Sequence, residues 1–424
     1  MYVRRGRSNG QRESPMVAVV MSEWQLQGQE LKGLRMARRI RVGYACIEDA
    51  SSVATWSGTT ANILHALRDR ADIDLELISP LKTALRWTYL PHRFIGKIAN
   101  SHFCWENEDR SLRYFAAQVQ NAVHDRKLDV VFATSTLPVA KLERPTPAVF
   151  WSDSAYYSMV DYYPRRPMTM RARRKYFQTE EAAVTRASFA CYASHWAADA
   201  AARMTDPSRV KVLPFGPNLP IEHNLDDVQN WIRERRQGRS QCCTLLFVGK
   251  EWERKGGPVA VETARRLNQA GIATTLEVVG CIPDEVLPPF VELAGFIDKR
   301  ESVGRERLAE LYRTSDIFIM PSRQEAFGVV VSEAAAFGVP AVVSDTGGLA
   351  ETVREGATGF RLPLDDDGSL FAERVMSILQ DYEKFAKNAY AEFQTRLNWR
   401  TSVDILVDLL QQAAAHSADS ANFG

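Results

Sequence analysis

Short apolar runs alternate with longer amphipathic stretches along most of this chain. From Arg41 onward, runs rich in Val, Ile and other apolar residues recur, and segments with helical spacing separate them. This alternation is typical of βα units that build a parallel sheet covered by helices on both faces. The pattern therefore predicts an α/β fold of the doubly wound type.

Six apolar runs in the first half have the length of buried strands. We place these strands at Ile40 to Cys46, Ile73 to Ile78, Val130 to Thr134, Ala148 to Trp151, Phe189 to Tyr192 and Val210 to Leu213. The stretch VLPFGPNLPIEHNL follows, and its three prolines and one glycine push the backbone out of regular structure. We expect the first sheet to end there.

A second alternating series begins at Thr244. Its runs are TLLFVG, TTLEVVG, VELAGF, DIFIMPS, PAVVS and GFRLP, and helices follow after Ser369. A chain of 424 residues exceeds the size of one hydrophobic core, so two domains are expected. We predict a basic, disordered tail at 1–35, Rossmann-like domains at 36–213 and 242–395, a linker at 214–241, and a helix at 396–424 that packs back on the first domain.

The amino-acid composition mainly excludes certain classes of partner and certain locations. The net charge of +1 favours neither nucleic acid nor an acidic partner. The six cysteines show no CxxC spacing, and no stretch reaches the roughly 18 apolar residues of a membrane span. We therefore expect a cytoplasmic protein. Its ligand is expected in a cleft between the two sheets, beyond the carboxyl ends of their strands.

The stretch SRQEAFGVVVSEAAAFG places two carboxylates around the start of a short helix. Glu325 follows a buried strand, and Glu333 lies on the second turn of the helix among Val and Ala residues. Between them, Phe327, Gly328 and Val329 offer backbone N–H groups at the helix N-terminus, where the dipole favours anions. The arrangement predicts a site for a polar, negatively charged ligand.

These residues resemble the E-x7-E motif of retaining, family 4 glycosyltransferases of the GT-B fold, and the resemblance extends from Arg41 to about His416. It implies two Rossmann-like domains facing across a cleft and a nucleotide-sugar donor. It also implies that Glu325 approaches the transferred sugar and that Glu333 binds the ribose. A helix-start glutamate and a surface glutamate would give the same spacing without any function.

The second motif is FVGKEWERKGG, where a strand ends and a helix begins at a glycine pair. Lys250 and Lys255 supply two cations beside free backbone donors, which suits a diphosphate. Similar family members hold the nucleotide diphosphate at these positions, although an arginine is more usual than Lys250. A charged surface loop is the alternative interpretation.

Two motifs in the first half face the same expected cleft. Gly58 lies in SGTT, directly before an amphipathic helix, and resembles the family's glycine loop opposite the donor. Asp153 follows a strand end and is a candidate catalytic residue near the acceptor. Ser152 precedes it where related enzymes often carry a histidine, so no histidine base is expected here. Either residue could simply begin a helix.

The remaining signals concern metals and partners. The DID sequence at Asp72 precedes a strand instead of ending one, which argues against a metal site, and we predict no metal and no cofactor besides the donor. The run from Arg165 to Lys175 is rich in arginine and is a candidate for peripheral contact with an anionic membrane surface. The acceptor is not specified by the sequence.

The predicted reaction is sugar transfer with retention at the anomeric carbon and without a metal ion. The two lysines and the helix N-termini would stabilise the departing diphosphate. Same-face displacement, in which the leaving phosphate takes the acceptor's proton, fits better than a carboxylate nucleophile. Hydrolysis by paired carboxylates, epimerisation on a GT-B fold, and binding of a sugar nucleotide without catalysis are the alternatives.

Overall fold

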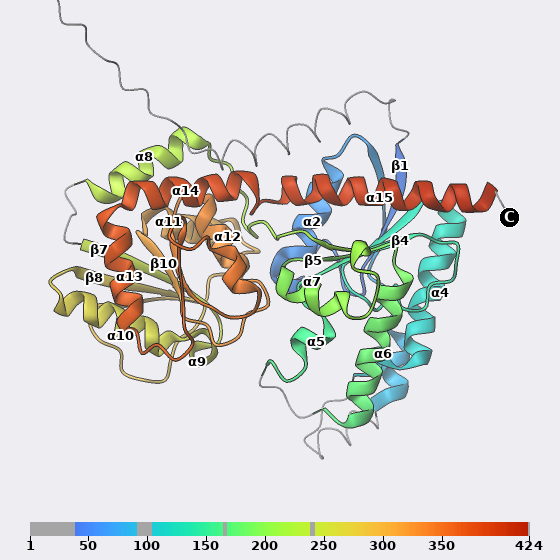
Figure 1. Cartoon of the computed structure of the whole chain (residues 1–424), viewed down its shortest axis with the longest axis horizontal. Coiled ribbons are helices and arrows are strands. Elements are labelled where there is room, and N and C mark those ends of the chain that lie inside the picture. The colour runs from blue at the N-terminus through green and yellow to red at the C-terminus, as the bar shows by residue number, and fades with distance from the viewer. Residues whose placement is uncertain (1–38, 91–103, 164–167, 238–241, 423–424) are drawn as a thin grey trace, which may run out of the picture. The chain divides into compact units, whose positions relative to one another are not determined.

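The computed structural model of this chain describes residues 39–90, 104–163, 168–237 and 242–422, with side chains in the last helix up to residue 416. The predicted tail at 1–35 lies outside the described residues. From Ile40 onward the chain holds two six-stranded sheets, each packed between helices (Figure 1). We call the part built on the first sheet the first lobe and the part built on the second sheet the second lobe.

The first sheet is entirely parallel in its described pairings and has the strand order β2-β1-β3-β4-β5-β6. Its strands are β1 (Ile40–Ala45), β2 (Ile73–Ile78), β3 (Val130–Ala133), β4 (Ala148–Ser152), β5 (Phe189–Tyr192) and β6 (Val210–Val212). The direction of chain progression reverses between β1 and β3. Parallel sheets bind their ligands beyond the carboxyl ends of the strands at such a point.

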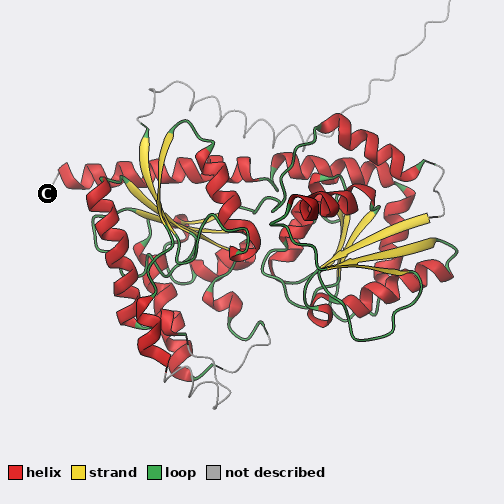
Figure 2. Cartoon of the chain, turned by 180° about the vertical axis from the view of Figure 1, so that it is seen from behind, coloured by secondary structure: helices red, strands yellow, loops and turns green. Residues whose placement is uncertain are grey.

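The second sheet repeats this plan, with the strand order β12-β11-β10-β7-β8-β9. Its strands are β7 (Cys242–Val248), β8 (Ala273–Val279), β9 (Val291–Gly295), β10 (Ile317–Met320), β11 (Ala341–Ser344) and β12 (Gly359–Leu362). Its reversal point lies between β7 and β10, which are neighbours in the sheet. Figure 2 shows both sheets in yellow, each twisted and enclosed by helices.

The central strands explain why the sequence pattern located the sheets. All residues of β3 and β10 are buried, because helices cover both faces of a parallel sheet and such strands become continuous apolar runs. The edge strand β9 is instead partly exposed. The prediction of two doubly wound parallel sheets is confirmed.

Helices follow most strands. The first lobe contains α2 (Thr59–Arg68), α4 (Asp109–Arg126), α5 (Tyr156–Met159), α6 (Met170–Arg186) and α7 (His195–Ala202). The second lobe contains α9 (Trp252–Lys255), α10 (Gly257–Gln269), α11 (Ser302–Thr314), α12 (Val329–Ala336), α13 (Ser369–Gln380) and α14 (Tyr382–Thr395). Short 3₁₀ turns are η2 (Thr55–Gly58), η3 (Ala84–Tyr89), η4 (Trp105–Asn107), η5 (Pro207–Arg209) and η6 (Gly347–Thr352).

The segment predicted as a linker, 214–241, contains a helix of its own. Helix α8 (Leu225–Arg236) buries Val228 and Ile232 in the core of the second lobe, because the two residues lie one turn apart on one face. Its buried Arg235 donates hydrogen bonds to the carbonyl oxygens of Phe337 and Gly338. Among the described residues of this segment, most of the connection without regular structure therefore lies before α8.

The last helix, α15 (Trp399–Asn422), belongs to the core of the first lobe. Its buried residues Val403, Leu406, Val407 and Leu410 form an apolar stripe that packs with residues of β1, β3 and β4. Figure 1 shows α15 running from the end of α14 across the first sheet. The last helix therefore completes the hydrophobic core that the strands of the first sheet build.

Candidate functional site

The reversal point of the second sheet brings together the two motifs that the sequence singled out. β7 ends at Val248 and β10 ends at Met320, and the loops after these neighbouring strands lead to Lys255 and Glu325. The ammonium group of Lys255 forms an ion pair with the carboxylate of Glu325. Two residues 70 positions apart are thus joined at the place where this fold binds ligands.

A glycine makes this approach possible. Gly256 has φ of 78° and links α9 to α10. A Cβ atom at this position would lie 2.0 Å from the carbonyl oxygen of Pro321 at the end of β10. Only glycine tolerates both the left-handed backbone and the contact, so the first glycine of KGG sets the position of Lys255 against β10.

Arg254 adds a second cation to the Lys255–Glu325 pair. Its guanidinium lies 3.8 Å from the Glu325 carboxylate and donates a 2.6 Å hydrogen bond to the carbonyl oxygen of Gln324. The Lys255 and Glu325 side chains are only 12% and 15% exposed. Shielding from water strengthens these interactions. Arg254 also donates two 2.9 Å hydrogen bonds to the Glu251 carboxylate, so the two cations here face two carboxylates. We call Arg254, Lys255 and Glu325 the cation cluster.

Lys250 lies apart from this cluster. Its ammonium group lies 5.4 Å from the centre of the Phe296 ring, and Phe296 follows β9 and is exposed. No contact between Lys250 and Glu325 is seen among the described residues. The structure therefore brings one of the two predicted lysines to the glutamate and places the other on the β9 side of the sheet.

Glu333 is fully buried on α12. One carboxylate oxygen accepts from the Lys299 ammonium at 2.6 Å and from the backbone N–H of Asn218 at 3.2 Å, and the other accepts from the Tyr312 hydroxyl at 2.8 Å. A ribose would have to displace one of these donors to reach the carboxylate. Its predicted contact with the donor ribose stays a prediction.

The residues between the two glutamates begin α12. Gly328 has φ of 87° and precedes Val329, the first residue of the helix. Phe327 is buried, and its ring packs edge-on against Phe215 of the segment that follows the first sheet, with centroids 5.4 Å apart. Phe327 therefore contributes a core side chain, so any contact with a ligand would come from backbone atoms.

The first lobe presents an unusual turn near its own reversal point. Trp56, Ser57 and Gly58 have φ values of 46°, 56° and 96°, so three successive residues are left-handed directly before α2. Left-handed residues other than glycine cost of order 1–3 kcal/mol each and cluster at functional sites. The side-chain amide of Asn218 supports the turn by donating to the Ser57 carbonyl and the Thr59 hydroxyl.

Asn218 therefore connects the two lobes. Its side chain holds the turn before α2 in the first lobe, and its backbone N–H donates to Glu333 in the second lobe. The predicted Gly58 and Glu333 are linked through one residue that the sequence did not single out. Its only signal was its position among the prolines of VLPFGPNLP.

Asp153 lies after β4 and accepts a 3.2 Å hydrogen bond from the indole N–H of Trp56. Burial raises the pKa of its carboxyl group above the ordinary value, and the negative charge of Glu325 acts in the same direction. Asp153 is therefore near enough to Glu325 for the two negative charges to interact. Ser152 beside it donates to the Ser154 carbonyl.

A tyrosine pair from the first lobe covers the cation cluster. The hydroxyl of Tyr162 accepts a 2.9 Å hydrogen bond from the backbone N–H of Glu325 and lies 2.8 Å from the Thr346 hydroxyl. The Arg254 guanidinium lies 5.4 Å from the centre of the Tyr163 ring. Burial raises the pKa of Tyr163 well above its ordinary value, with Glu325 as a further cause.

Glu351 makes a further contact between the lobes. Its carboxylate oxygens accept 2.8 Å hydrogen bonds from the backbone N–H groups of His195 and Trp196, which begin α7. This carboxylate therefore caps the N-terminus of α7. Together with the tyrosine contacts, it explains why the cation cluster is largely enclosed in this structure.

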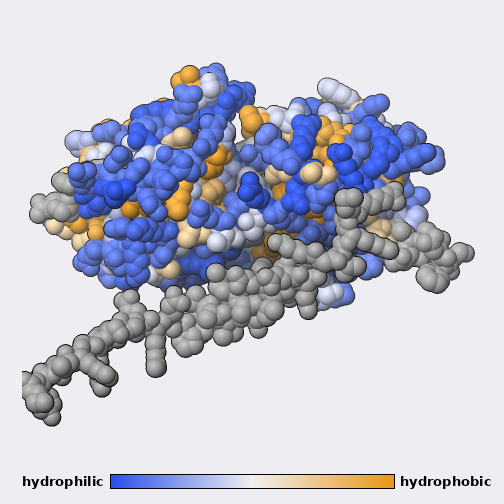
Figure 3. Space-filling model, turned by 90° about the horizontal axis from the view of Figure 1, so that it is seen from above, coloured by the Kyte–Doolittle hydropathy of each residue, from blue (hydrophilic) through white to orange (hydrophobic). Residues whose placement is uncertain are grey.

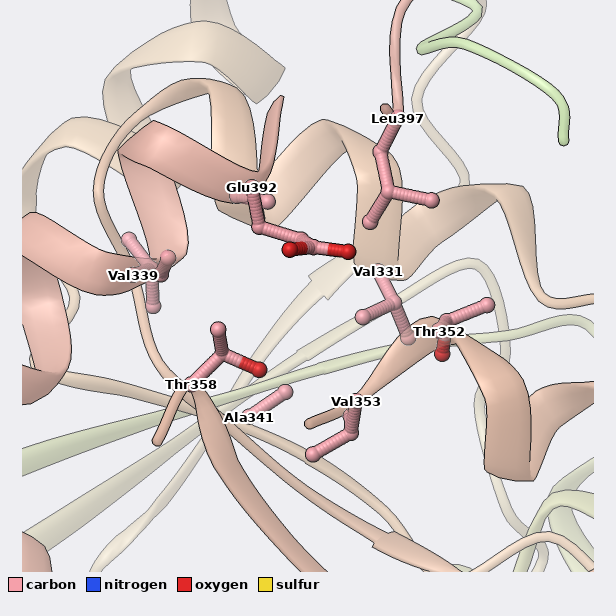
Figure 4. A pocket seen from close by; sticks show the side chains of 10 residues that line it. Val331, Val339, Ala341, Thr352, Val353, Thr358, Glu392 and Leu397 are labelled. Atoms are coloured by element: carbon pink, nitrogen blue, oxygen red, sulfur yellow. The ribbon is translucent and has the colours of Figure 1, made fainter. Parts of the chain in front are cut away.

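Two cavities lie outside the cation cluster. A small one of about 10 Å³, with room for about one water molecule, lies beside α12 and is lined mainly by apolar residues, and Figure 4 shows the Glu392 carboxylate directed into it. A larger groove of about 1200 Å³ runs along α2, residues 217–223 and the start of α15. Neither is lined by Glu325, Lys255 or Asp153. Figure 3 shows the face that carries α15 as mostly hydrophilic with small apolar patches.

Neither a metal-binding cluster nor a membrane-spanning helix is present among the described residues. No group of three or more His, Cys, Asp or Glu side chains among them could hold a metal ion. No described helix is long and apolar enough to cross a membrane. That the reaction needs no metal and no cofactor besides the donor stays a prediction.

Comparison with known proteins identifies the second lobe. Residues 242–381 match the family model of glycosyl transferases group 1. A glycogen synthase of Mycobacterium tuberculosis is 31% identical over 203 residues, which are 44% of this chain and 47% of that protein. A D-inositol 3-phosphate glycosyltransferase of Geodermatophilus obscurus is 28% identical over 226 residues, or 50% of this chain and 49% of the relative. These matches span about half the length of the curated relatives.

Solved structures extend the likeness to both lobes. Sucrose-phosphate synthase from Thermosynechococcus elongatus has a TM-score of 0.63 at 19% identity, covering 89% of this chain and 100% of that one. Anabaena Alr3699/HepE in complex with UDP-glucose has a TM-score of 0.55 at 18% identity, covering 90% and 100%. The predicted GT-B fold and the relationship to glycosyltransferases are confirmed, and membership of family 4 stays a prediction.

Proposed function

We propose that this chain, a GT-B protein whose second lobe carries a glycosyl transferases group 1 domain, transfers a sugar from a nucleotide-sugar donor to an acceptor. The observation that carries the proposal is the cation cluster at the reversal point of the second sheet. It places two cations beside Glu325 where this fold binds ligands, with Glu251 as the closer partner of Arg254. The relatives named above are glycosyltransferases or sugar synthases, and one related structure holds UDP-glucose.

The donor would bind with its diphosphate on the cations. Each cation already has a carboxylate partner, Glu325 for Lys255 and Glu251 for Arg254, so both are held in place for an anion that displaces such a partner. The diphosphate would replace Glu325 as the partner of Lys255 and release that carboxylate toward the sugar. The start of α10, next to Lys255, adds the positive end of a helix dipole.

The chemical step needs charge stabilisation at two places. As the bond from the anomeric carbon to the diphosphate breaks, the leaving oxygens gain negative charge and the sugar gains positive charge. Arg254 and Lys255 would stabilise the leaving group without a metal ion, and Glu325 would stabilise the sugar. With retention, the acceptor oxygen attacks from the face that the diphosphate leaves, and the leaving phosphate takes the acceptor's proton.

Asp153 would bind the acceptor or the sugar from the first lobe. Its carboxyl group is coupled to Glu325 by charge and is fixed by the Trp56 indole. Because burial raises its pKa, the group can keep a proton at higher pH than an ordinary aspartate and donate a hydrogen bond to a sugar hydroxyl. This role replaces that of the histidine that related enzymes often carry at the position of Ser152.

The test compares Glu325→Gln with a matched surface variant, Glu383→Gln. Both glutamates pair with a lysine, but Glu383 lies exposed on α14 beside Lys387. Melting temperatures with UDP-, GDP- and ADP-sugars identify the donor, since a ligand at 100 times its Kd adds about 2.7 kcal/mol of stability. We expect Glu325→Gln to keep the donor-induced shift and to lose at least about 100-fold in transfer rate, whereas Glu383→Gln keeps both.

Three results would contradict parts of this proposal. Full transfer activity in Glu325→Gln would remove that residue from the reaction. Sugar released only to water, with every acceptor tested, would indicate a hydrolase. Activity that disappears with a chelator and returns with a divalent ion would show that the cations of the second lobe do not suffice.

A further inference from the structure

The end of the first lobe that contains η3 and the start of α6 carries exposed apolar side chains. Met170, the first residue of α6, is 82% exposed, and Trp87 in η3 is 64% exposed. Leu90 directly after η3 is also exposed. Large apolar side chains exposed in one region mark a binding surface more often than single scattered ones do.

These side chains belong to one surface. Both η3 and α6 contact the short turn η4. Within that contact, the rings of Tyr89 and Trp105 lie 6.3 Å apart. Figure 1 shows α6 and the light-blue turns of η3 at the same end of the lobe.

Basic residues surround the apolar ones. Arg171 and Arg174 follow Met170 on α6 and are exposed, and the Arg86 guanidinium lies 5.2 Å from the centre of the Trp87 ring. Arg165 and Arg166 of the basic run lie outside the described residues. We call Arg86, Trp87, Met170, Arg171 and Arg174 the α6–η3 surface.

Acidic neighbours offset only part of this charge. Glu108 lies 3.6 Å from Arg171 and 3.8 Å from Lys175, so one carboxylate serves two cations. Asp161, which is exposed, pairs with Arg173 of the same helix. Arg86 and Arg174 add positive charge beyond these pairs, so the surface is locally basic although the whole chain is nearly neutral.

We propose that the α6–η3 surface docks the protein on an anionic lipid surface. Trp and Met can bury their apolar tips at the level of the lipid headgroups while arginines contact the phosphates. Each basic residue close to such a surface raises binding about fivefold, and salt weakens the effect. A soluble polyanion would explain the arginines but not the exposed Met170 and Trp87.

The surface is close to the candidate site along the chain. Tyr163 contacts Arg254 of the cation cluster, and Met170 follows seven residues later. An extended chain spans at most about 3.6 Å per residue, so the two regions lie within roughly 25 Å of each other. Docking through α6 would therefore hold the candidate site near the membrane, where an acceptor carried by a lipid could reach it.

The experiment measures binding of the full chain to vesicles, with no donor or acceptor present, so its outcome is independent of the proposed reaction. Neutral phosphatidylcholine vesicles are compared with vesicles that contain about one-third phosphatidylglycerol. We expect binding to the anionic vesicles only, and a loss of about tenfold or more between low and high salt.

Two double variants of the α6–η3 surface, compared with one control variant, test whether this surface binds the vesicles. Arg171→Gln/Arg174→Gln is expected to weaken binding about 25-fold, at about fivefold per charge. The control Arg265→Gln/Arg374→Gln, which removes two partly exposed arginines of the second lobe, is expected to change it less than twofold. Trp87→Ser/Met170→Ser tests the apolar contribution and is expected to weaken binding as well, with unchanged melting temperature in all three variants.

The proposal fails if the wild-type chain binds neutral and anionic vesicles equally well. It also fails if Arg171→Gln/Arg174→Gln and the control Arg265→Gln/Arg374→Gln lose binding to the same extent. Unchanged binding in Trp87→Ser/Met170→Ser would also overturn it, because the surface would then recognise charge alone, as a site for a soluble polyanion does.

Discussion

The two lobes share one sheet plan but place different chemistry at their reversal points. In the second lobe, the loops after β7 and β10 supply Arg254, Lys255 and Glu325. In the first lobe, the loops after β1 and β4 supply the left-handed turn at Gly58 and the partly buried acid Asp153. The topology of the sheet determines where a ligand binds, and the side chains that follow the strands determine which part of the ligand each lobe contacts. The charged part of a donor suits the second lobe, and neutral hydroxyl groups suit the first.

The lobes also differ in how they keep a buried acid. In the second lobe, Glu333 is paired with the Lys299 ammonium. In the first lobe, Glu180 on α6 is equally buried, but the neutral hydroxyl of Tyr192 donates to it at 3.0 Å. A cation stabilises the ionised form of a carboxyl group, whereas burial beside a neutral donor favours the protonated form. This difference predicts that removing the carboxylate has different consequences in the two lobes.

Removing the carboxylate of Glu333 should have the largest effect. Glu333→Ala leaves the Lys299 ammonium without its partner and the buried Tyr312 hydroxyl without an acceptor, and breaking such a pair costs about 3–5 kcal/mol. Urea unfolding monitored by circular dichroism measures the loss. The matched control is Glu310→Ala, which removes a half-exposed partner of Arg313 and should cost less than about 1 kcal/mol. Equal losses would mean that the Glu333 network adds no stability.

Lys299, Tyr312 and Asn218 show what the sequence could not predict. All three come from other loops and helices, 34, 21 and 115 residues away from Glu333. The apolar neighbours of Glu333 on its helix indicated a polar partner, which was predicted as a ligand, whereas the protein itself supplies three donors. Only the arrangement of the second sheet brings these donors together, and no local pattern records that.

The strands and the helix starts were predictable for a physical reason. Buried parallel strands are uninterrupted apolar runs, so Val130 to Thr134 was predicted where the structure has Val130–Ala133. The turn before α2 was only partly predictable, because Gly58 signals a left-handed residue but Trp56 and Ser57 do not. Helix α8 was missed because the prolines before it dominated the prediction of a linker.

The next largest effect should be a loss of kcat/KM on mutation of Lys255, and this loss should exceed that on mutation of Lys250. Lys255→Ala removes a cation from the cluster at Glu325 and should lower kcat/KM for the donor by about 10²–10³, the usual loss for one preorganised group. Lys250→Ala should lower it by less than about tenfold, because an exposed point charge near a ligand contributes little. Steady-state kinetics with a saturating acceptor measure both. A greater loss in Lys250→Ala would place the diphosphate on the β9 side of the sheet.

The smallest effect concerns Glu180 and pH. Burial raises the pKa of Glu180 from 4.5 to about 7. The folded protein therefore keeps the proton after the unfolded chain has lost it, and the stabilising contribution, complete below pH 4.5, is lost as pH rises to about 7. At 1.36 kcal/mol per unit of pKa, this loss is of the order of 3 kcal/mol.

Glu180→Gln cannot titrate and should lack this loss. Its stability relative to the wild-type chain should therefore rise between pH 4.5 and 7 and stay constant above pH 7, as measured by urea unfolding at each pH. A difference between Glu180→Gln and the wild-type chain that does not vary with pH would show that Glu180 is ionised in the folded state.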